Sequence, residues 1–247
     1  MSPSRTLAVI VPVYNEAALV ERAIGSLRDC PAPAGIERLI IAVDDGSSDG
    51  TGGILDRLDA EHEELVVVHL KPNRGKGAAI RAGMERAGRV GERGADFVLI
   101  HDADLEYDPA DHARVLGPLL DGRADAVLGT RFLGQTHRVL YYWHSIANRA
   151  ITTLCNMVTN LNLTDIECCT KAFTREVAER LGTKEDRFGI EPEMVARLAR
   201  MRVDGKPLRI FEVPVSYAGR TYAEGKKIRA RDGVRAAWCI IRYGLFG

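Results

Sequence analysis

The chain has 247 residues, a length that fits one α/β unit with a core large enough to be stable without cross-links. Its 34 Lys and Arg residues balance 34 Asp and Glu residues, so the net charge gives no reason to expect nucleic acid as a partner. The five cysteines are odd in number and form no C-x-x-C pair. This pattern argues against a disulfide framework and a zinc site, and we expect buried, reduced thiols.

The N-terminal residues 1–6 lack the charged and apolar regions of a signal peptide. No run of about 18 uncharged apolar residues occurs, so no helix is expected to span a bilayer. The sequence therefore predicts a cytoplasmic protein.

Short apolar strands alternate with amphipathic helices in the first half of the chain. The expected strands are residues 7–13, 39–43, 65–70, 97–100 and 124–128. Apolar residues at helical spacing predict helices near 20–27, near 54–58 and after the third strand as far as Met84. This alternation predicts an α/β fold with a doubly wound, mostly parallel sheet flanked by helices. Ligands of such sheets bind beyond the carboxyl ends of the strands.

The second half of the chain is less regular. Helices are expected at 141–161, 192–202 and 228–243, and a strand at 209–217. Neither a repeat nor a linker interrupts the sequence, so residues 1–247 are expected to form a single domain.

The acidic segment H-D-A-D-L-E follows the strand at 97–100. Side chains alternate at the end of a strand, so Asp102, Asp104 and Glu106 are expected to point the same way. Crowded carboxylates repel one another unless a cation lies among them, and a hard divalent ion that also binds phosphate oxygens fits this need. The alternative is a solvated acidic loop. An EF-hand is excluded because Tyr107 replaces the required Gly and Ala113 the required Glu.

Three further polar motifs lie between the expected elements. D-D-G-S-S-D-G-T, residues 44–51, is expected to bind a base or ribose through Asp44, to form a turn that caps the next helix through Asp49, or to do both. N-R-G-K-G, residues 73–77, opens a helix in a manner that suits an anion or nucleotide. A dinucleotide fingerprint is not complete, because Ile80 replaces its third Gly, and no P-loop motif occurs. The basic segment 219–229 is either a loop that closes over a diphosphate or a solvated charge run.

The motifs VPVYNE, VDDGSSDGT, NRGKGAAIRAG, HDADLEYDP, GTRF and GRTYAEGKKI follow one another in this order. With this set the chain resembles the family-2 inverting glycosyltransferases of the GT-A fold, and most of all the dolichyl- or polyprenyl-phosphate mannose and glucose synthases. The resemblance extends over about residues 7–229.

The resemblance implies a metal-dependent transfer of a hexose from a nucleoside-diphosphate sugar to a polyprenyl phosphate, with Mn²⁺ or Mg²⁺ as the cofactor. It divides the domain near residue 135 into a nucleotide-sugar half, about 1–134, and an acceptor half, about 135–247, with the basic loop and final helix. The residues implied to bind the donor nucleotide are Pro12, Tyr14, Glu16, Asp44, Lys76, Asp102 and Ala103. Those implied to neutralise its diphosphate are Arg220, Lys226 and Lys227.

The remaining implied roles belong to the reaction. Asp102 and Asp104 would hold the metal with Glu106 as a third ligand, and Arg131 would meet the acceptor phosphate. Catalytic roles are implied for Asp104, Arg131 and either Glu191 or Glu193, where relatives carry a catalytic base. A phosphate acceptor is already anionic near pH 7 and needs no strong base, whereas a hydroxyl acceptor must lose a proton to Glu191 or Glu193.

Two other functions are weighed against this one. The first is a glycosyltransferase that acts on a soluble hydroxyl acceptor, such as a small metabolite or natural product. The second is a nucleotide-sugar-binding subunit without turnover, against which the intact metal motif argues. A sugar nucleotidyltransferase is disfavoured because VPVYNE stands where its Gly- and Arg-rich loop would be.

A lipid acceptor predicts contact with the inner face of the cell membrane. Many relatives continue into C-terminal membrane helices, which this sequence lacks, so a membrane-anchoring partner is one expectation. The aromatic run 141–143 favours a membrane interface. In the final helix, an apolar stripe adjoins a basic face, and this stripe either lies on anionic lipid or docks on the protein's own core. The stripe consists of Ala230, Val234, Ala237 and Ile241, and the adjoining face of Arg231, Arg235, Trp238 and Arg242.

Overall fold

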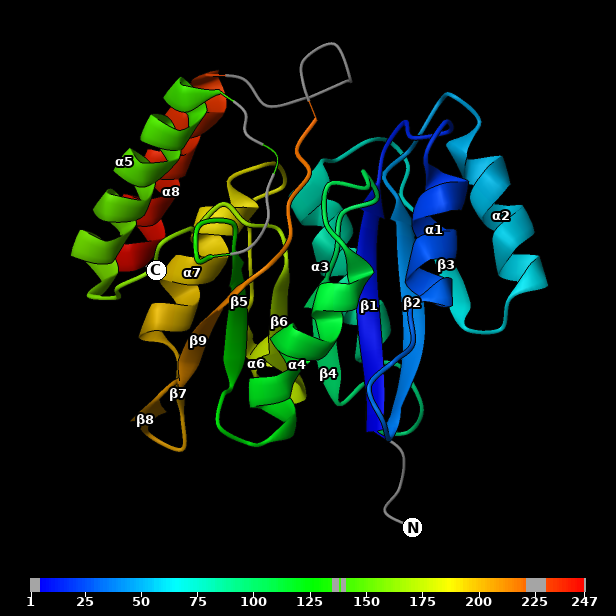
Figure 1. The fold of residues 1–247 in the computed structure, drawn as a ribbon, viewed down its shortest axis with the longest axis horizontal. Coiled ribbons are helices and arrows are strands. Elements are labelled where there is room, and N and C mark those ends of the chain that lie inside the picture. The colour runs from blue at the N-terminus through cyan, green and yellow to red at the C-terminus, as the bar shows by residue number, and fades with distance from the viewer. Residues whose placement is uncertain (1–4, 135–137, 139–140, 221–229, 247) are drawn as a thin grey trace.

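A seven-stranded sheet forms the centre of the molecule (Figure 1). The computed structural model describes residues 5–134, 138, 141–220 and 230–246. The strand order is β3-β2-β1-β4-β6-β5-β9. The strands are β1 (Arg5–Val13), β2 (Ile36–Asp44), β3 (Leu65–His69), β4 (Phe97–Ile100), β5 (Ala126–Thr130), β6 (Lys171–Thr174) and β9 (Ile210–Pro214).

The sheet is mostly parallel, as predicted. β1 pairs in parallel with both β2 and β4, β2 with β3, and β5 with β9. β6, which was not predicted, is antiparallel to both β4 and β5 and joins the two parallel parts. Because the chain leaves β1 for β2 on one side and reaches β4 on the other, the sheet has a switch point beside β1, where open α/β sheets bind ligands.

The two faces of β1 bury different side chains. Leu7, Val9 and Val11 lie in the larger core with the apolar residues of α1, α2 and α4, whereas Ala8 and Ile10 pack with α3 on the opposite face. The helices are α1 (Val20–Asp29), α2 (Thr51–Glu61), α3 (Lys76–Ala87), the 3₁₀ turn η1 (Pro109–Asp111), α4 (His112–Leu120) and α6 (Arg175–Arg180). Both faces of the sheet are therefore covered, as a parallel sheet requires (Figure 1).

Three helices pack together at the β9 side of the molecule: α5 (Tyr142–Thr159), α7 (Ile190–Arg200) and α8 (Ala230–Phe246). A small hairpin of β7 (Arg202–Val203) and β8 (Lys206–Pro207) follows α7. α5 and α8 lie side by side, and both begin at the end of the molecule where β1 and β2 end (Figure 1). The beginnings of these two helices therefore lie at the ligand-binding end of the sheet.

The predicted apolar stripe of α8 does not dock on the core. The side chains of α8 that are buried are Ala236, Cys239, Ile240 and Tyr243, whereas Val234 and Ile241 of the predicted stripe are exposed. The neighbouring stripe of α8 is buried instead, because α8 packs against α5 and α7. The expectation that the Val234 stripe could cover the protein's own core is thus wrong.

All five cysteines are free thiols, and four of them are buried. Along the described part of the chain, none of the helices combines the length and the apolar character needed to cross a lipid bilayer.

Candidate active site

A cleft of about 450 Å³ lies at the carboxyl ends of β1, β2 and β4. Most of the predicted site residues line it: Pro12, Tyr14, Glu16, Lys76, Asp102, Ala103, Asp104, Glu106, Arg131, Glu191 and Arg220. The structure therefore brings together residues from five separate motifs at the switch point of the sheet.

Lys76 is the central cation of the cleft. It is the first residue of α3, and its ammonium group lies 2.9 Å from the Asp102 carboxylate and 2.8 Å from that of Glu191. Glu191 is paired a second time, with the buried Lys171 at 2.8 Å. Burial alone would lower the pKa of Lys76, but the charges of Asp102 and Glu191 outweigh it and hold that pKa well above its usual value. Lys76 is therefore a fixed positive charge.

The opposite side of the cleft holds a second charge cluster around Arg220. Its guanidinium nitrogens lie 3.5 Å from Glu16, 3.4 Å from Asp104 and 3.5 Å from Glu106. Burial, followed by the negative charges of Asp102 and Glu106, raises the pKa of Asp104 to about 7. The carboxylates here are crowded enough to favour a cation among them.

The residues present fit a divalent ion that is shared with the donor phosphates. Asp104 would supply the main carboxylate, with Asp102 beside it, because one or two carboxylates plus phosphate oxygens suffice for such an ion. Within the described ranges, no three His, Cys, Asp or Glu side chains form a metal site by themselves. The expectation of Glu106 as a third ligand is therefore corrected: its carboxylate accepts hydrogen bonds from the Tyr217 hydroxyl at 2.8 Å and the Arg220 amide at 2.7 Å.

Asp45, and not Asp44, lines the cleft. The Asp45 carboxylate accepts hydrogen bonds from the amides of Arg74 and Gly75 and so holds the loop that leads into α3. Asp44 is buried and turned away, with its carboxylate 3.0 Å from the ring of His69. The predicted contact of Asp44 with a base is corrected accordingly, because adjacent side chains at the end of β2 point in opposite directions.

Asp49 fixes the start of α2, although Gly50 and not Asp49 is the N-cap residue of that helix. Its carboxylate accepts hydrogen bonds from the amide and the hydroxyl of Thr51, the first residue of α2. It also accepts one from the amide of Ala17, which follows the VPVYNE motif. The acidic turn therefore fixes the loop after β1 as well as the start of α2.

Glu193 is a structural residue. It is fully buried, and its carboxylate accepts hydrogen bonds from the amides of Lys184 and Glu185 and from Arg197. It does not line the cleft, so the expectation that it could be the catalytic base is corrected. Glu193 follows Glu191 by two residues, a rotation of about 200° around the helix, which explains why only one of the two reaches the substrate side.

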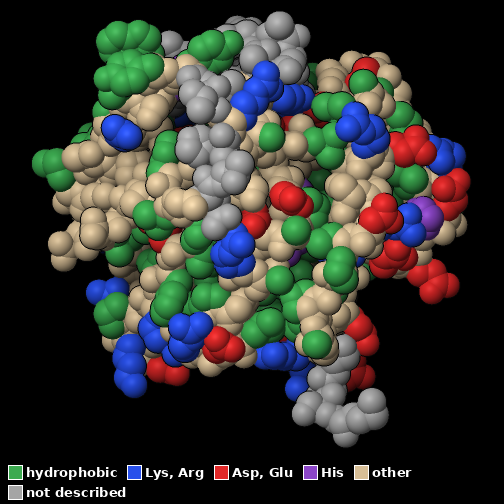
Figure 2. Space-filling view, viewed as in Figure 1, with side chains coloured by type: hydrophobic (Ala, Val, Ile, Leu, Met, Phe, Trp, Pro, Cys, Tyr) green, Lys and Arg blue, Asp and Glu red, His purple; other side chains and the backbone are tan. Residues whose placement is uncertain are grey.

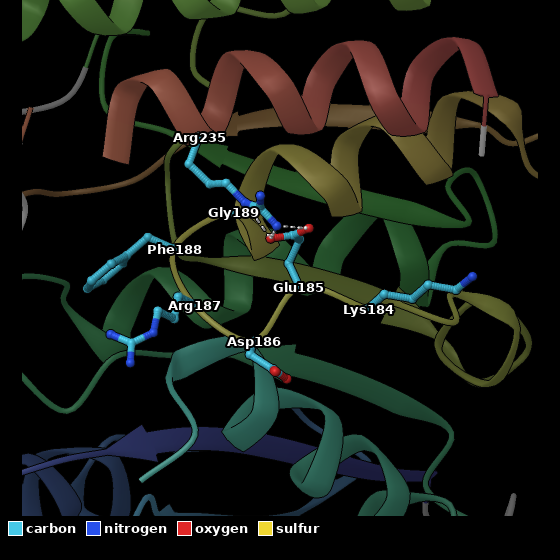
Figure 3. Close-up of a pocket in the computed structure, with 7 residues that line it drawn as sticks. All are labelled: Lys184, Glu185, Asp186, Arg187, Phe188, Gly189 and Arg235. Carbon is cyan, nitrogen blue, oxygen red and sulfur yellow. Dashed lines mark hydrogen bonds and ion pairs between the residues drawn. The ribbon is translucent and has the colours of Figure 1, made fainter. Parts of the chain in front are cut away.

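The loop 184–189 before α7 forms a second cavity of about 300 Å³ next to the cleft (Figure 3). Arg235 of α8 is paired with Glu185 inside this cavity at 2.8 Å, and Arg187 points away from that pair (Figure 3). Arg187 and Phe188 line the cleft as well. A side chain at Gly77 would clash with the Glu185 carbonyl, since a Cβ there would lie 2.0 Å from it. The glycine thus allows this loop to pack directly on the start of α3.

Arg131 is held rigidly at the edge of the cleft. Its guanidinium donates two hydrogen bonds to the fully buried Asp165, at 2.6 and 2.8 Å, and lies over the Tyr217 ring. Asn148 of α5 donates a further hydrogen bond to Asp165 at 3.1 Å. Burial alone would lower the pKa of Arg131, but the Asp165 charge keeps it well above its usual value. Such a preorganised guanidinium suits a phosphate or carboxylate.

Several cleft residues were not predicted from the sequence. They are Val13, Asp45, Asn73, Gly75, Ala79, Tyr107, Glu167, Cys169, Arg187, Phe188 and Tyr217. Some lie inside the quoted motifs, where no role had been assigned to them, whereas Glu167, Cys169, Arg187, Phe188 and Tyr217 lie outside the motifs. Among the latter, the cluster D-I-E-C-C at 165–169 carried a signal, as adjacent acidic and thiol groups in an apolar stretch. The predicted diphosphate ligands Lys226 and Lys227 lie outside the described residues.

The comparisons with known proteins agree with this geometry. Residues 8–182 match the model of glycosyl transferase family 2. The chain is 32% identical to the undecaprenyl-phosphate mannosyltransferase of Micrococcus luteus, over 96% of this chain and 93% of that protein. It is 31% identical to the polyprenol monophosphomannose synthase of Mycolicibacterium smegmatis, over 72% of this chain and 65% of that protein.

Solved structures share the fold. Glucosyl-3-phosphoglycerate synthase from Mycobacterium tuberculosis, in complex with Mn²⁺, uridine diphosphate and glucosyl-3-phosphoglycerate, superimposes with a TM-score of 0.68 at 20% identity, over 97% of this chain and 80% of that chain. The sheet, with its cleft at the switch point, is that of the GT-A glycosyltransferases. The family match covers most of the chain, and the protein belongs to glycosyl transferase family 2. It is a glycosyltransferase.

Proposed function

We propose that this enzyme transfers a hexose from a nucleoside-diphosphate sugar, with uridine or guanosine as the nucleoside, to a polyprenyl phosphate. Two of the relatives named above carry undecaprenyl phosphate or polyprenol monophosphomannose in their names, and the first is aligned over nearly its whole length. The motifs for the nucleotide and the acceptor meet in one cleft, which supports a direct transfer between the two substrates.

The observation that carries the choice of a phosphate acceptor is the double pairing of Glu191. Its carboxylate lies 2.8 Å from the ammonium groups of both Lys76 and Lys171. The Glu191 carboxylate is therefore already engaged by two cations of the protein and is not free to approach a substrate hydroxyl group. Glu193 is remote from the cleft, so neither predicted base is well placed to activate a hydroxyl group. A phosphate oxygen needs no such activation.

The reaction follows from this arrangement as an in-line displacement. An oxygen of the acceptor phosphate, oriented by Arg131, forms a bond to the anomeric carbon of the donor sugar. The bond from that carbon to the diphosphate oxygen breaks, its electron pair stays on the nucleoside diphosphate, and the configuration inverts. Lys76 and Arg220 lie where they can stabilise the negative charge of the leaving group, which is the kind of interaction that usually contributes most to catalysis.

We also propose that Mn²⁺ or Mg²⁺ is the cofactor, held by Asp104 with Asp102. When bound, such an ion supplies Lewis-acid stabilisation of the diphosphate. Solved structures with this fold were obtained with Mn²⁺ or Mg²⁺ and uridine diphosphate.

The membrane is the natural location of such an acceptor, and the surface of α5 and α8 supports contact with an anionic bilayer. Trp143 of α5 and Val234 of α8 are each 74% exposed. Figure 2 shows hydrophobic side chains protruding at the edge of the molecule formed by these two helices. Exposed Arg149 and Arg242 lie on the same two helices, and this mixture of aromatic, aliphatic and basic groups suits an anionic membrane surface. We infer that the protein attaches peripherally to the membrane through this surface.

A donor and acceptor screen tests the proposal. Release of nucleoside diphosphate from UDP- and GDP-hexoses is measured with a polyprenyl phosphate and, as the matched control, with the corresponding polyprenol. Release that depends on the phosphate is the expected result. Release that occurs equally with the polyprenol, or only with soluble alcohols, would favour the hydroxyl-acceptor alternative.

A further inference from the structure

Glu167 is a carboxyl group of the cleft that the reaction above does not use. It lies between α5 and β6 and lines the cleft. Its Oε1 atom is buried and has no hydrogen-bond partner within the described part of the chain. A buried, ionised carboxylate with an unpaired oxygen is costly, and native structures seldom retain one without a functional reason.

The neighbouring cations are already matched by other carboxylates. Lys171 is paired with Glu191 at 2.8 Å, and Arg131 with Asp165 at 2.6 Å. Glu167 is therefore an additional carboxyl group in a cluster whose charges already balance. Burial, followed by the charge of Glu191, raises the pKa of Glu167 to about 7. The titratable and charged groups that surround it are Arg131, Cys155, Asp165, Lys171 and Glu191.

Glu167 and Arg131 are positioned by the same residue. The Asp165 carboxylate accepts hydrogen bonds from the Arg131 guanidinium and, at 3.2 Å, from the backbone amide of Glu167. Both side chains line the cleft. Because the Glu167 carboxyl group also interacts electrostatically with Arg131 in this cleft, a phosphate that pairs with Arg131 would lie near that carboxyl group.

We propose that Glu167 is an acceptor-binding residue, which donates a hydrogen bond from a protonated carboxyl group to the phosphate that pairs with Arg131. The inference rests on the proposed phosphate acceptor and deepens it. An ionised Glu167 would repel the phosphate and compete with it for Arg131, whereas the neutral acid completes the site with a donor. Acceptor binding then depends on the protonation of Glu167.

The test compares wild type, Glu167→Gln and Glu167→Ala with a short-chain prenyl phosphate between pH 6 and pH 8.5. In the wild type, the acceptor KM should rise about tenfold from pH 6 to pH 8, because only the protonated fraction binds. Glu167→Gln keeps a hydrogen-bond donor that does not ionise, so its acceptor KM should stay low at pH 8. Glu167→Ala should raise the acceptor KM at pH 6. The donor KM should be unchanged in all three proteins. Ionisation of the acceptor phosphate affects all three proteins equally, so it does not alter the comparison between them.

A second measurement does not need turnover. A carboxyl group with a raised folded-state pKa contributes stability that is lost as the pH rises through that pKa. The unfolding midpoint of Glu167→Gln, relative to that of the wild type, should therefore increase as the pH rises from 5 to 8. Glu179→Gln, an exposed position on α6, serves as the control and should show no such gain.

The results that would overturn the role of Glu167 differ from those that would overturn the proposed function. An acceptor KM of Glu167→Gln that rises with pH as in the wild type would overturn the inference alone. A large loss of kcat in Glu167→Gln at unchanged KM would also overturn it, because Glu167 would then act as a base. If the wild type transfers no sugar to prenyl phosphate at any pH, the proposed function itself fails.

Discussion

The ammonium group of Lys76 lies 2.8 Å from the carboxylate of Glu191. Lys76 is the first residue of α3, which follows the nucleotide motifs, and Glu191 is the second residue of α7, in the half of the chain expected to bind the acceptor. One buried ion pair therefore connects the two halves of the cleft. Lys76 also pairs with Asp102, so it connects Glu191 on the acceptor side to the acidic motif on the donor side.

Loss of Lys76 should harm both stability and activity. Lys76→Met leaves Asp102 and Glu191 buried with one cation fewer, and removal of one partner of a buried ion pair costs about 3 kcal/mol of unfolding free energy. We expect kcat/KM to fall by about a hundredfold, equivalent to ~2.7 kcal/mol of transition-state stabilisation. Urea unfolding and steady-state kinetics measure the two effects. Lys71→Met, at an exposed position nearby, is the control, and equal behaviour of the two variants would contradict the role of Lys76.

Asp104 should be needed for metal-dependent binding of the donor nucleotide. Burial and the charges of Asp102 and Glu106 raise the pKa of Asp104, and a divalent ion beside its carboxylate would relieve this crowding of negative charge. In Asp104→Ala, calorimetry should show that Mn²⁺ no longer strengthens the binding of uridine or guanosine diphosphate, while the unfolding midpoint stays near that of the wild type. The exposed Asp121→Ala is the matched control. Full turnover of the wild type in excess chelator would refute this prediction.

His69 links the turn after β2 to α2, and its contribution should depend on pH. Its ring nitrogens lie 3.0 Å from Asp44 and 2.8 Å from Asp56. Burial alone would lower the pKa of His69, but hydrogen bonds to Asp56 and Asp44 outweigh it and raise that pKa. A raised histidine pKa gives stability that is full below about pH 6.5 and is lost as the pH rises through the folded-state pKa.

Substitution of this histidine therefore tests the corrected role of Asp44. We expect His69→Gln to lower the thermal midpoint by roughly 2 °C more at pH 5.5 than at pH 9. The effect is small because solvent screens the contact between His69 and the exposed Asp56. Nucleoside diphosphate binding should change little, because Asp44 does not line the cleft. A strong loss of nucleotide binding in His69→Gln would instead restore Asp44 to the site.

The exposed surface of α5 and α8 should control access to acceptors in a membrane. The double variant Trp143→Ser, Val234→Ser removes two side chains that are each 74% exposed, so the fold should be little affected. Sedimentation with anionic vesicles should fall several-fold. Transfer to polyprenyl phosphate embedded in vesicles should fall with it, whereas transfer to a short-chain prenyl phosphate in solution should not change. Unaltered vesicle binding would contradict the assignment of this surface.

The first half of the fold follows from its sequence pattern because its strands are short apolar runs that end in polar turns. β6 was not predicted, since Lys171–Thr174 contains a lysine that only the pairing with Glu191 makes compatible with burial. The buried face of α8 was left open between two alternatives for a related reason. Helical spacing identifies apolar stripes, but the packing against α5 and α7 decides which stripe is buried.

The candidate site was predictable where a motif fixes a side chain at a strand end, as at Asp102 and Asp104. Where two identical residues lie close together in the sequence, the pattern could not predict which of them faces the cleft. Asp44 and Asp45 are chemically identical, and so are Glu191 and Glu193, so only the direction of the backbone at each position decides which carboxylate faces the cleft. Glu167 was missed because its environment, and not its sequence context, gives it an unusual protonation state.

The most direct measurement is the transfer of a labelled hexose from its nucleoside diphosphate to a polyprenyl phosphate, with the matching polyprenol as the control acceptor. The purified protein is incubated with Mg²⁺ or Mn²⁺, and the label that passes into the organic phase is counted. We expect label in the lipid fraction with the phosphate, none with the polyprenol, and none in excess chelator. Label that appears only on a soluble hydroxyl compound, or on polyprenol as readily as on its phosphate, would contradict it.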